Sequence, residues 1–309
     1  MALSRTHIIN CVKCAQFIKD PILRTGVVSR KEDGGVLSWG GGFSTVVQIL
    51  INGEYWAFKV WHSEFENMQI RYSRIKDKLS GLELPYFVKF DYEAKGLFDG
   101  ENFFASKRMK WIDGIPLNEY INKYIFDSER INMLAKRFRI MMKALHIYEI
   151  AHGDLQHGNI FIRSDGSLKL IDYDSMFVNT LLGMPDFING QAGYQHPKRI
   201  ENEFVGDYLD NFSEILIYFS LLVYSEKPEL WNPDTDWLLF SKEDLEFPES
   251  CTLLEQFKSS DNSLIRYIAL HFSNILNFDD ISLIPTLEDL LSSNVEITLP
   301  NLKNITDKF

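Results

Sequence analysis

The chain has 309 residues, of which 45% are hydrophobic and 14% aromatic, and its formal net charge at pH 7 is −11. This length and apolar content can fill a large core, in one big domain or in two lobes. The acidic balance argues against non-specific nucleic-acid binding, which requires a basic surface. Three cysteines cannot make a disulfide framework, and no secretory signal is recognisable, so we expect a reducing, cytoplasmic location.

Residues 1–35 are predicted to form a helical extension that packs against the rest of the chain. Apolar residues recur there at helical spacing, and Asp20 before a proline breaks the run. Cys11 and Cys14 form a lone C-x-x-C pair. Because no second pair exists, we favour two small apolar residues on one helical face over a zinc or redox site.

A glycine-rich turn stands at the head of a predicted β-hairpin. The hairpin consists of residues 47–51, an Asn52-Gly53 turn and residues 54–61, and Asn-Gly between two β-rich runs is a strong hairpin signal. Bare backbone at such a turn can approach phosphate groups closely and donate N–H groups to them. A flexible loop would look the same, so the turn is only a candidate nucleotide-binding loop. Its candidate residues are Gly40, Gly41, Gly42, Phe43 and Ser44.

Lys59 lies between large apolar residues in the second strand of this hairpin. On an edge strand such a lysine would point to solvent. Because a glycine-rich turn precedes it in the same hairpin, we favour a contact with nucleotide phosphates. A helix is predicted over residues 65–80, but Glu64 and Glu66 come early and Asp77 comes late, so no acidic partner is assigned to Lys59.

Residues 84–92 and 102–111 are predicted strands, separated by a turn region at 96–100. The second strand runs into a short connection with glycine and proline and then into a predicted helix over 118–124. A hinge between two lobes has this layout and would offer backbone N–H and C=O groups to an adenine ring. The candidate hinge residues are Met109 and Trp111.

Two long helices are predicted to lie in the core of the second half. Residues 215–224 form the longest apolar stretch, which is about half the length of a membrane span and is better explained as a buried helix. Residues 129–150 form an amphipathic helix. Its buried stripe is predicted to consist of Ile131, Leu134, Phe138, Met141, Met142 and Leu145.

The stretch between these helices carries the strongest functional pattern. Residues 160–162 and 168–171 are predicted strands, joined by a Ser-Asp-Gly-Ser turn. This hairpin holds two polar clusters at a fixed separation. Asp154 and Asn159 precede it, and Asp172 follows it directly.

The spacing His-x-Asp-x-x-x-x-Asn, followed by an Asp after an apolar strand, resembles the catalytic and metal-binding loops of protein kinases. The resemblance implies an α+β, two-lobed protein-kinase-like fold. A small antiparallel β lobe would span residues 36–110, and a larger, mainly helical lobe would span 111–309. The His-Gly-Asp-Leu-x-x-Gly-Asn and Ile-Asp-Tyr-Asp patterns also look like the aminoglycoside phosphotransferase and related atypical-kinase branch. Combined with Gly-Tyr-Gln-x-Pro, they resemble bacterial serine/threonine-kinase-like proteins.

This resemblance implies an ATP- and Mg²⁺-dependent phosphotransferase, with Mn²⁺ as an alternative cation. Asp154 would accept or orient the proton of the acceptor hydroxyl. Asn159 and Asp172 would ligate the metal, because Mg²⁺ prefers hard oxygen ligands. Lys59 and the turn at residues 40–45 would hold the nucleotide.

The chain departs from the protein-kinase pattern at several positions. Thr45 replaces the third glycine of the loop, Gly153 replaces the arginine before the catalytic aspartate, and Gln156 replaces a lysine. Asp174 stands where a glycine is usual, and we expect it to stiffen the metal loop and to tune Asp172. The usual Ala-Pro-Glu is His-Pro-Lys, ending at Lys198.

These departures leave three functions open. The first is a protein serine/threonine kinase, which is favoured because each metal and base position is filled. The second is a small-molecule phosphotransferase of the same fold, and the third is a nucleotide-binding pseudokinase that acts as a regulatory binding module. The expected partner is a protein substrate or a small-molecule hydroxyl acceptor, without nucleic acid or membrane.

Overall fold

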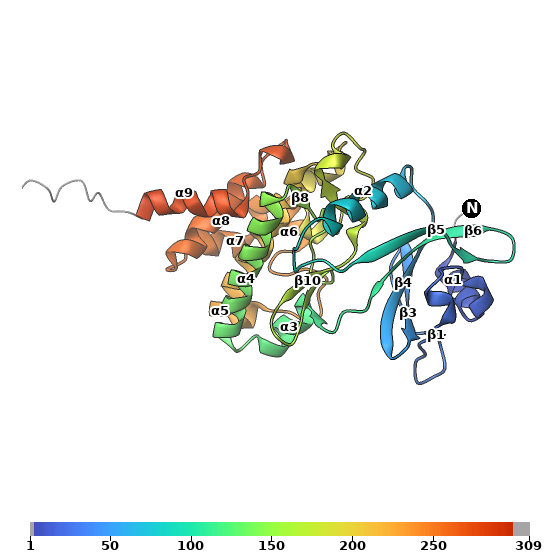
Figure 1. Ribbon diagram of the computed structural model, residues 1–309. Helices are drawn as coiled ribbons and strands as arrows, with labels where there is room; N and C mark the ends of the chain where they lie inside the picture. The colour runs from blue at the N-terminus through green and yellow to red at the C-terminus, as the bar shows by residue number, and fades with distance from the viewer. Residues whose placement is uncertain (1–2, 299–309) are drawn as a thin grey trace, which may run out of the picture. The chain divides into compact units, whose positions relative to one another are not determined.

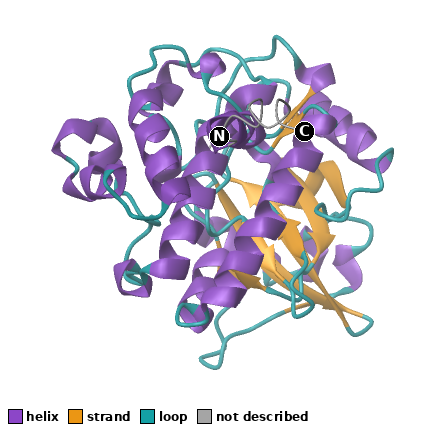
Figure 2. Ribbon diagram, turned by 90° about the vertical axis from the view of Figure 1, so that its left-hand side faces the viewer, coloured by secondary structure: helices purple, strands orange, loops and turns teal. Residues whose placement is uncertain are grey.

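The computed structural model describes residues 3–298, with side chains as far as residue 292 (Figure 1). It divides into two compact units, and the boundary falls between Asp113 and Gly114. The first unit is built on an antiparallel β-sheet, and the second is mainly helical (Figure 2). This is the kinase-like α+β fold that the sequence predicts.

The sheet of the first unit has the order β1-β3-β4-β6-β5, and β2 pairs with β3. All its pairings are antiparallel. The predicted hairpin is confirmed: Asn52 and Gly53 join β3 to β4 with φ of 50° and 83°. The strands are β1 (Val27–Val28), β2 (Ser38–Trp39), β3 (Ser44–Ile51), β4 (Glu54–Trp61), β5 (Phe90–Phe98) and β6 (Phe103–Lys110).

The prediction for β5 was wrong in its boundaries. The strand begins at Phe90 and continues through Gly96, where a turn had been expected. The register shifts between Glu93 and Leu97, and a Cβ on Gly96 would lie 1.7 Å from Ser106 Oγ. The glycine therefore marks an irregular strand segment that approaches its neighbour closely.

The N-terminal segment covers one face of this sheet. It contains α1 (Arg5–Val12) and the short 3₁₀ helices Ala15–Phe17 and Leu23–Thr25, and it shares one buried cluster with the strands. Members of that cluster are Leu3, Ile8, Cys11, Val12, Ile18, Leu23, Val36, Val47, Ile49, Phe58, Val60 and Leu97. The prediction that the two cysteines are apolar residues on one helical face holds for Cys11 and is wrong for Cys14. Cys11 is buried, but α1 ends before the exposed Cys14, so the two do not share a helical face.

A buried ion pair fixes the same segment to the sheet. Arg108 in β6 reaches the fully buried Asp20 with a separation of 2.6 Å and reaches Asp91 with the same separation. The other oxygen of Asp20 accepts the backbone N–H groups of Ile22 and Leu23, both at 2.9 Å. The carboxylate thus accepts hydrogen bonds from two backbone N–H groups and pairs with the guanidinium. A buried charge is stable only with partners of this kind.

The second unit packs its helices around α5, whose apolar residues are buried on nearly all sides. The predicted stripe of α4 is buried throughout. Among residues 3–298, no helix combines the length and the apolar character needed to cross a membrane. The helices are α3 (Leu117–Tyr124), α4 (Ser128–Ile147), α5 (Asn211–Glu226), α6 (Lys242–Glu246), α7 (Thr252–Lys258), α8 (Ser263–Ile275) and α9 (Leu287–Thr298).

Five short strands complete the described part of the second unit, residues 114–298. In one sheet β9 lies between β10 and β7, and in another β8 pairs with β11. The predicted hairpin after the catalytic loop is confirmed as β9 and β10. The strands are β7 (Ile115–Pro116), β8 (Ile150–Ala151), β9 (Ile160–Ile162), β10 (Leu168–Leu170) and β11 (Phe177–Val178).

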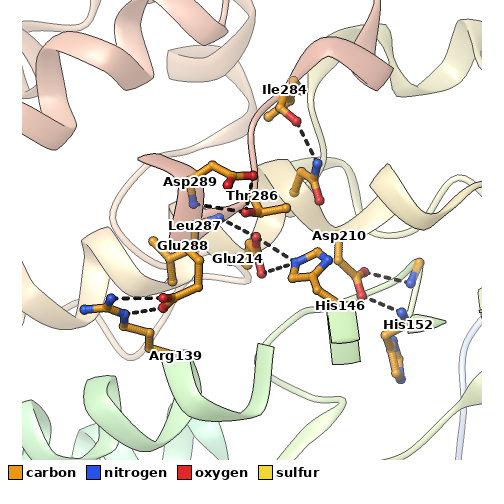
Figure 3. A network of polar contacts seen from close by, with 12 residues as sticks. Arg139, His146, His152, Asp210, Glu214, Ile284, Thr286, Leu287, Glu288 and Asp289 are labelled. Carbon is orange, nitrogen blue, oxygen red and sulfur yellow. Dashed lines mark hydrogen bonds and ion pairs between the residues drawn. The ribbon is translucent and has the colours of Figure 1, made fainter. Parts of the chain in front are cut away.

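A network of polar contacts joins α4, α5 and α9 (Figure 3). The buried Glu214 of α5 accepts hydrogen bonds from His146 at 3.0 Å and from the backbone N–H of Leu287 at 2.6 Å. Arg139 of α4 pairs with Glu288 of α9. Burial raises the pKa of Glu214. Burial alone would lower the pKa of His146, but the hydrogen bond and charge of Glu214 outweigh it and raise that pKa.

From the pair of His146 and Glu214 we predict that the free energy of unfolding falls as the pH rises through the raised pKa of His146. The fall begins near pH 6.5, which is about the pKa of an unperturbed histidine. Over that interval the folded protein holds a proton that the unfolded chain has released, so each added pH unit favours unfolding. The raised pKa of Glu214 acts in the same direction at lower pH. Urea unfolding midpoints between pH 6 and 9 measure the slope.

The variant His146→Gln should flatten this slope, because it removes the titrating ring. His271→Gln is the control, since this histidine of α8 contacts a backbone carbonyl rather than a carboxylate. An unchanged slope in His146→Gln would contradict the assignment.

Candidate functional site

The predicted nucleotide-binding turn lies between β2 and β3. Gly40 has φ of +130°, and a Cβ there would lie 2.2 Å from the carbonyl oxygen of Ser44. Only glycine fits at that position. Gly41 and Gly42 have open space where a Cβ would stand, and the Phe43 side chain is 72% exposed. The turn therefore presents bare backbone, and its shape depends on Gly40.

His62 holds this turn from the end of β4. Its Nδ1 lies 2.8 Å from the carbonyl oxygen of Gly42, and its Nε2 lies 3.0 Å from the hydroxyl of Thr45. Because a carbonyl can only accept, the first contact requires a proton on Nδ1. The backbone N–H of His62 also donates to Phe43. Thr45, which stands in place of a third glycine, is thus part of the support for the loop.

Sequence reasoning missed His62. The available signal was its position directly after β4, next to the end of the β3–β4 pairing where Ser44 faces Trp61.

Lys59 lies on a central strand, not on an edge. It faces Val46 of β3 and Lys107 of β6, and only 5% of it is exposed. Its Nζ lies 5.7 Å from the ring centre of Trp61. Lys107, which sequence reasoning also missed, is 2% exposed, and its Nζ lies 5.3 Å from the ring centre of Tyr72. Two lysines and several aromatic rings therefore share this face of the sheet.

The helix after β4 carries no glutamate. It is α2 (Met68–Ser80), its acidic residue is the exposed Asp77, and its buried polar and aromatic residues are Arg71 and Tyr72. The Glu64 carboxylate, which precedes the helix, accepts the backbone N–H of Ala105 at 3.3 Å. The glutamate that protein kinases place on this helix is thus replaced by basic and aromatic residues.

The two predicted hinge residues differ in their surroundings. Met109 is 8% exposed in β6. The backbone N–H of Trp111 donates to Tyr55 at 2.9 Å, and its indole lies 4.7 Å from that of Trp39. Because the N–H is already used, a base would meet the carbonyl or the indole of Trp111. Met109 and Trp111 remain predicted nucleotide contacts.

In the second unit, the structure brings Asp154 and Asn159 together. The amide Nδ2 of Asn159 donates to the backbone carbonyl of Asp154 at 2.9 Å and to its Oδ2 at 3.2 Å. This orientation of the amide leaves Oδ1 of Asn159 as its acceptor atom. Burial raises the pKa of the Asp154 carboxyl, and the charge of Asp172 adds to the rise, whereas His152 and a backbone N–H from Gln191 oppose it. A raised pKa suits a general base that works near neutral pH.

The loop before Asp154 is held by Asp210, which lies at the N-terminus of α5 and is fully buried. Its two oxygens accept the backbone N–H groups of His152 at 2.5 Å and of Gly153 at 2.8 Å (Figure 3). An aspartate directly before an apolar helix can cap that helix or brace a neighbouring loop. The structure shows the brace and no side-chain cap.

The same loop is joined to the segment that connects β10 to Asp172. His152 Nε2 donates to the carbonyl of Ile171 at 2.7 Å, and the N–H of Ile171 donates to the carbonyl of Asn159 at 3.0 Å. Asp172 itself has φ of +64°, which is uncommon for a residue with a side chain. Asp154, Asn159 and Asp172 are thus held on one hydrogen-bonded frame.

The residues after Asp172 form a closed 3₁₀ turn, Tyr173–Ser175. Tyr173 is fully buried, and its hydroxyl donates to the carbonyl of Leu170 at 2.9 Å. Asp174 is buried in the same turn. This geometry supports the expected stiff metal loop, and the tuning role of Asp174 remains a prediction.

The donor set fits a magnesium ion bound with a nucleotide. Within the described part of the chain, no three His, Cys, Asp or Glu side chains gather into a metal-binding group. Mg²⁺ in nucleotide sites needs only one or two protein oxygens, because phosphates and water complete its shell. The Asn159 amide oxygen and the Asp172 carboxylate are oxygens of that kind.

Comparison with known proteins agrees with this geometry. The model of the ABC1 atypical kinase-like domain matches residues 108–178. The chain is 25% identical over 190 residues to the probable serine/threonine-protein kinase PknB of Lactococcus lactis, covering 59% of this chain and 30% of that protein. It is 27% identical over 180 residues to the probable serine/threonine-protein kinase mkcE of Dictyostelium discoideum, covering 56% of this chain and 24% of that protein.

These findings show that the chain is similar to members of the protein-kinase-like superfamily. A kinase-like domain implies the use of ATP in general. The chain spans less than a third of the length of these two relatives, at 30% and 24%.

The support of the glycine loop by His62 leads to a prediction. His62→Ala should weaken the binding of an ATP analogue about threefold to tenfold, because the loop must then be ordered by the nucleotide itself. Titration calorimetry with a non-hydrolysable ATP analogue and Mg²⁺ measures the change. His7→Ala is the matched control, since His7 of α1 is exposed and pairs with Asp99. Equal affinities for both variants would contradict the role of His62.

Proposed function

We propose that this chain is an ATP- and Mg²⁺-dependent phosphotransferase that moves the γ-phosphate to a hydroxyl group, with protein Ser or Thr as the favoured acceptor. One observation carries the proposal. The side-chain amide of Asn159 holds the carboxylate of Asp154. Hydrogen bonds join the loop that carries both residues to Ile171, directly before Asp172.

The chemistry assigned to these residues is positioning and charge neutralisation. Asp154 would accept the proton of the acceptor hydroxyl. The hydroxyl oxygen would bond to the γ-phosphorus while the bond from that phosphorus to the leaving ADP oxygen breaks. Asn159 and Asp172 would hold Mg²⁺, which when bound offsets the negative charge of the phosphates. Lys59 would contribute a further positive charge to the phosphates.

A protein acceptor is supported by the partial similarity to two probable serine/threonine kinases and by the Gly-Tyr-Gln-x-Pro segment. A small-molecule acceptor is favoured by one observation at Gln156. Its Oε1 accepts the backbone N–H of Gly158 at 2.6 Å, so the side chain folds onto its own loop. A lysine at this position would reach toward a phosphate instead. The His-Gly-Asp pattern, which resembles that of small-molecule kinases, points the same way.

Transfer of radiolabelled γ-phosphate from Mg²⁺-ATP tests the proposal. Wild-type protein should label itself or a generic protein substrate. Asp172→Asn and Lys59→Ala should each lower the rate by about 100-fold or more. The first weakens the binding of Mg²⁺, and the second removes a positive charge at the phosphates. Asp174→Gly should retain transfer, since the tuning residue is not the ligand.

The outcomes separate the candidate functions. Labelling of small hydroxyl compounds alone would favour the small-molecule phosphotransferase. Nucleotide-induced thermal stabilisation with no γ-phosphate transfer would favour the pseudokinase and contradict the proposal. Equal losses in Asp172→Asn and Asp174→Gly would contradict the division of labour between these two aspartates.

A further inference from the structure

A backbone N–H from a distant segment contacts the carboxylate of Asp154. Gln191 donates this bond to Oδ1 at 2.9 Å, while Asn159 binds Oδ2. The residue before it, Gly190, has φ of +72°, and a Cβ there would lie 2.9 Å from Asp154 Oδ1 and 2.9 Å from Gln195 Nε2. The close approach of the segment to Asp154 therefore requires glycine at position 190.

A buried ion pair fixes the start of the same segment. The side chain of Asp186 is 1% exposed and lies 3.0 Å from the guanidinium of Arg199, which is 2% exposed. Asn202 Nδ2 also donates to Asp186 at 2.9 Å, and the N–H of Asp186 donates to Glu203 at 3.0 Å. Both carboxylate oxygens of Asp186 and both terminal nitrogens of Arg199 have partners within the fold, and such contacts keep a buried ion pair in place.

Arg199 connects this anchor to the catalytic loop. One of its Nη2 hydrogens is directed at the carbonyl of Gly153, the residue directly before Asp154, at 3.4 Å. At the other end of the segment, Gln195 donates to Ser213 at 3.2 Å, and the side chain of Gln191 donates to the carbonyl of Asp236 at 2.6 Å. The segment is thus held on both sides of the point where it meets Asp154.

We propose that residues 186–191 position the Asp154 carboxylate, with Gly190 and the Asp186–Arg199 pair as positioning residues. This rests on the proposed function, because Asp154 is taken as the group that receives the acceptor proton. Bonds on both carboxylate oxygens limit rotation of the group. Each oxygen accepts one of these bonds and keeps a second lone pair for an incoming hydroxyl.

The proposal implies that a carboxylate of the chain itself, rather than an added phosphate, holds the segment. Gly153 stands where protein kinases carry an arginine before the catalytic aspartate. In this chain Arg199 reaches the same backbone from the other side, and its partner is the carboxylate of Asp186. The negative charge that pairs with Arg199 is therefore a side chain of the protein, Asp186, and not a phosphate group.

The test compares Gly190→Ala with Gly183→Ala. Gly183 lies in the same region with φ of +79°, but a Cβ there would have no neighbour within 4 Å. Both variants carry the same backbone strain, and only Gly190→Ala moves the segment away from Asp154. With Mg²⁺-ATP, Gly190→Ala should lower kcat about 10- to 100-fold relative to Gly183→Ala and leave KM for ATP within about twofold. Equal kcat values would overturn the proposal.

A second pair of variants covers the case in which Gly190→Ala does not fold. Asp186→Ala removes the anchor, and Glu201→Ala removes an exposed carboxylate that pairs with Lys198 nearby. Only Asp186→Ala should show the loss of kcat at unchanged KM for ATP. The same loss in both variants, or in neither, would overturn the proposal.

A readout without catalysis separates this inference from the proposed function. Hydrogen exchange of the Gln191 amide should be slow in the wild type and at least about tenfold faster in Asp154→Ala, because the carboxylate is its acceptor. If the wild type transfers no phosphate but shows this protection, the proposed function fails and the positioning contact stands. If the amide exchanges equally fast in both proteins, the positioning contact is overturned whatever the activity.

Discussion

The second unit depends on one buried carboxylate, Asp210, which accepts two consecutive backbone N–H groups from the loop before Asp154. A charge with no solvent around it is stable only while its hydrogen bonds are made. Movement of the loop away from Asp210 would therefore leave a buried charge without its hydrogen bonds, which is unfavourable. Because Asp210 directly precedes α5, which lies at the centre of the helical core, the packing of that core sets the position of the proposed catalytic loop.

Two sets of hydrogen bonds connect the loop that Asp210 holds to the rest of the site. His152 carries the first to the strand before Asp172, through the carbonyl of Ile171. Asn159 carries the second, since its amide orients the Asp154 carboxylate and its backbone joins Ile171. The proposed base and both proposed metal ligands thus share one hydrogen-bonded frame. Such pre-ordering is what phosphoryl transfer needs, because most of its catalysis is positioning.

The first unit supports its proposed nucleotide contacts differently. Its N-terminal segment is part of the sheet's core, through a shared cluster and the Asp20–Arg108 pair. That leaves the opposite face for Lys59, Lys107 and their aromatic neighbours. The glycine turn is supported by His62, so the loop that is expected to meet phosphate has its own fixed base.

Much of this could be predicted from the sequence where the signal is local. The Asn52-Gly53 turn, the hairpin after Asn159 and the apolar stripe of α4 follow from turn chemistry and periodicity, and each is confirmed. The catalytic frame was predicted as residue types at a spacing. The boundaries of β5 were missed because Gly96 serves a close strand approach, which looks like a turn signal in sequence.

Contacts between distant segments could not be predicted in the same way. The position of His62 after a predicted strand does not by itself indicate that it holds Gly42, and nothing near Gly190 indicates that it lies against Asp154. Each depends on a pairing that only the folded chain creates. Asp210 is an intermediate case, because its place before an apolar helix suggested two roles and the fold selected one.

The most direct test of the account is amide hydrogen exchange at His152 and Gly153, compared between wild-type protein and Asp210→Asn. Asp207→Asn, an exposed change three residues earlier in the sequence, is the control. The account predicts strong protection of both amides in the wild type and in the control, and a loss of protection by about tenfold or more in Asp210→Asn. Equal protection in all three proteins would contradict the claim that Asp210 holds the catalytic loop.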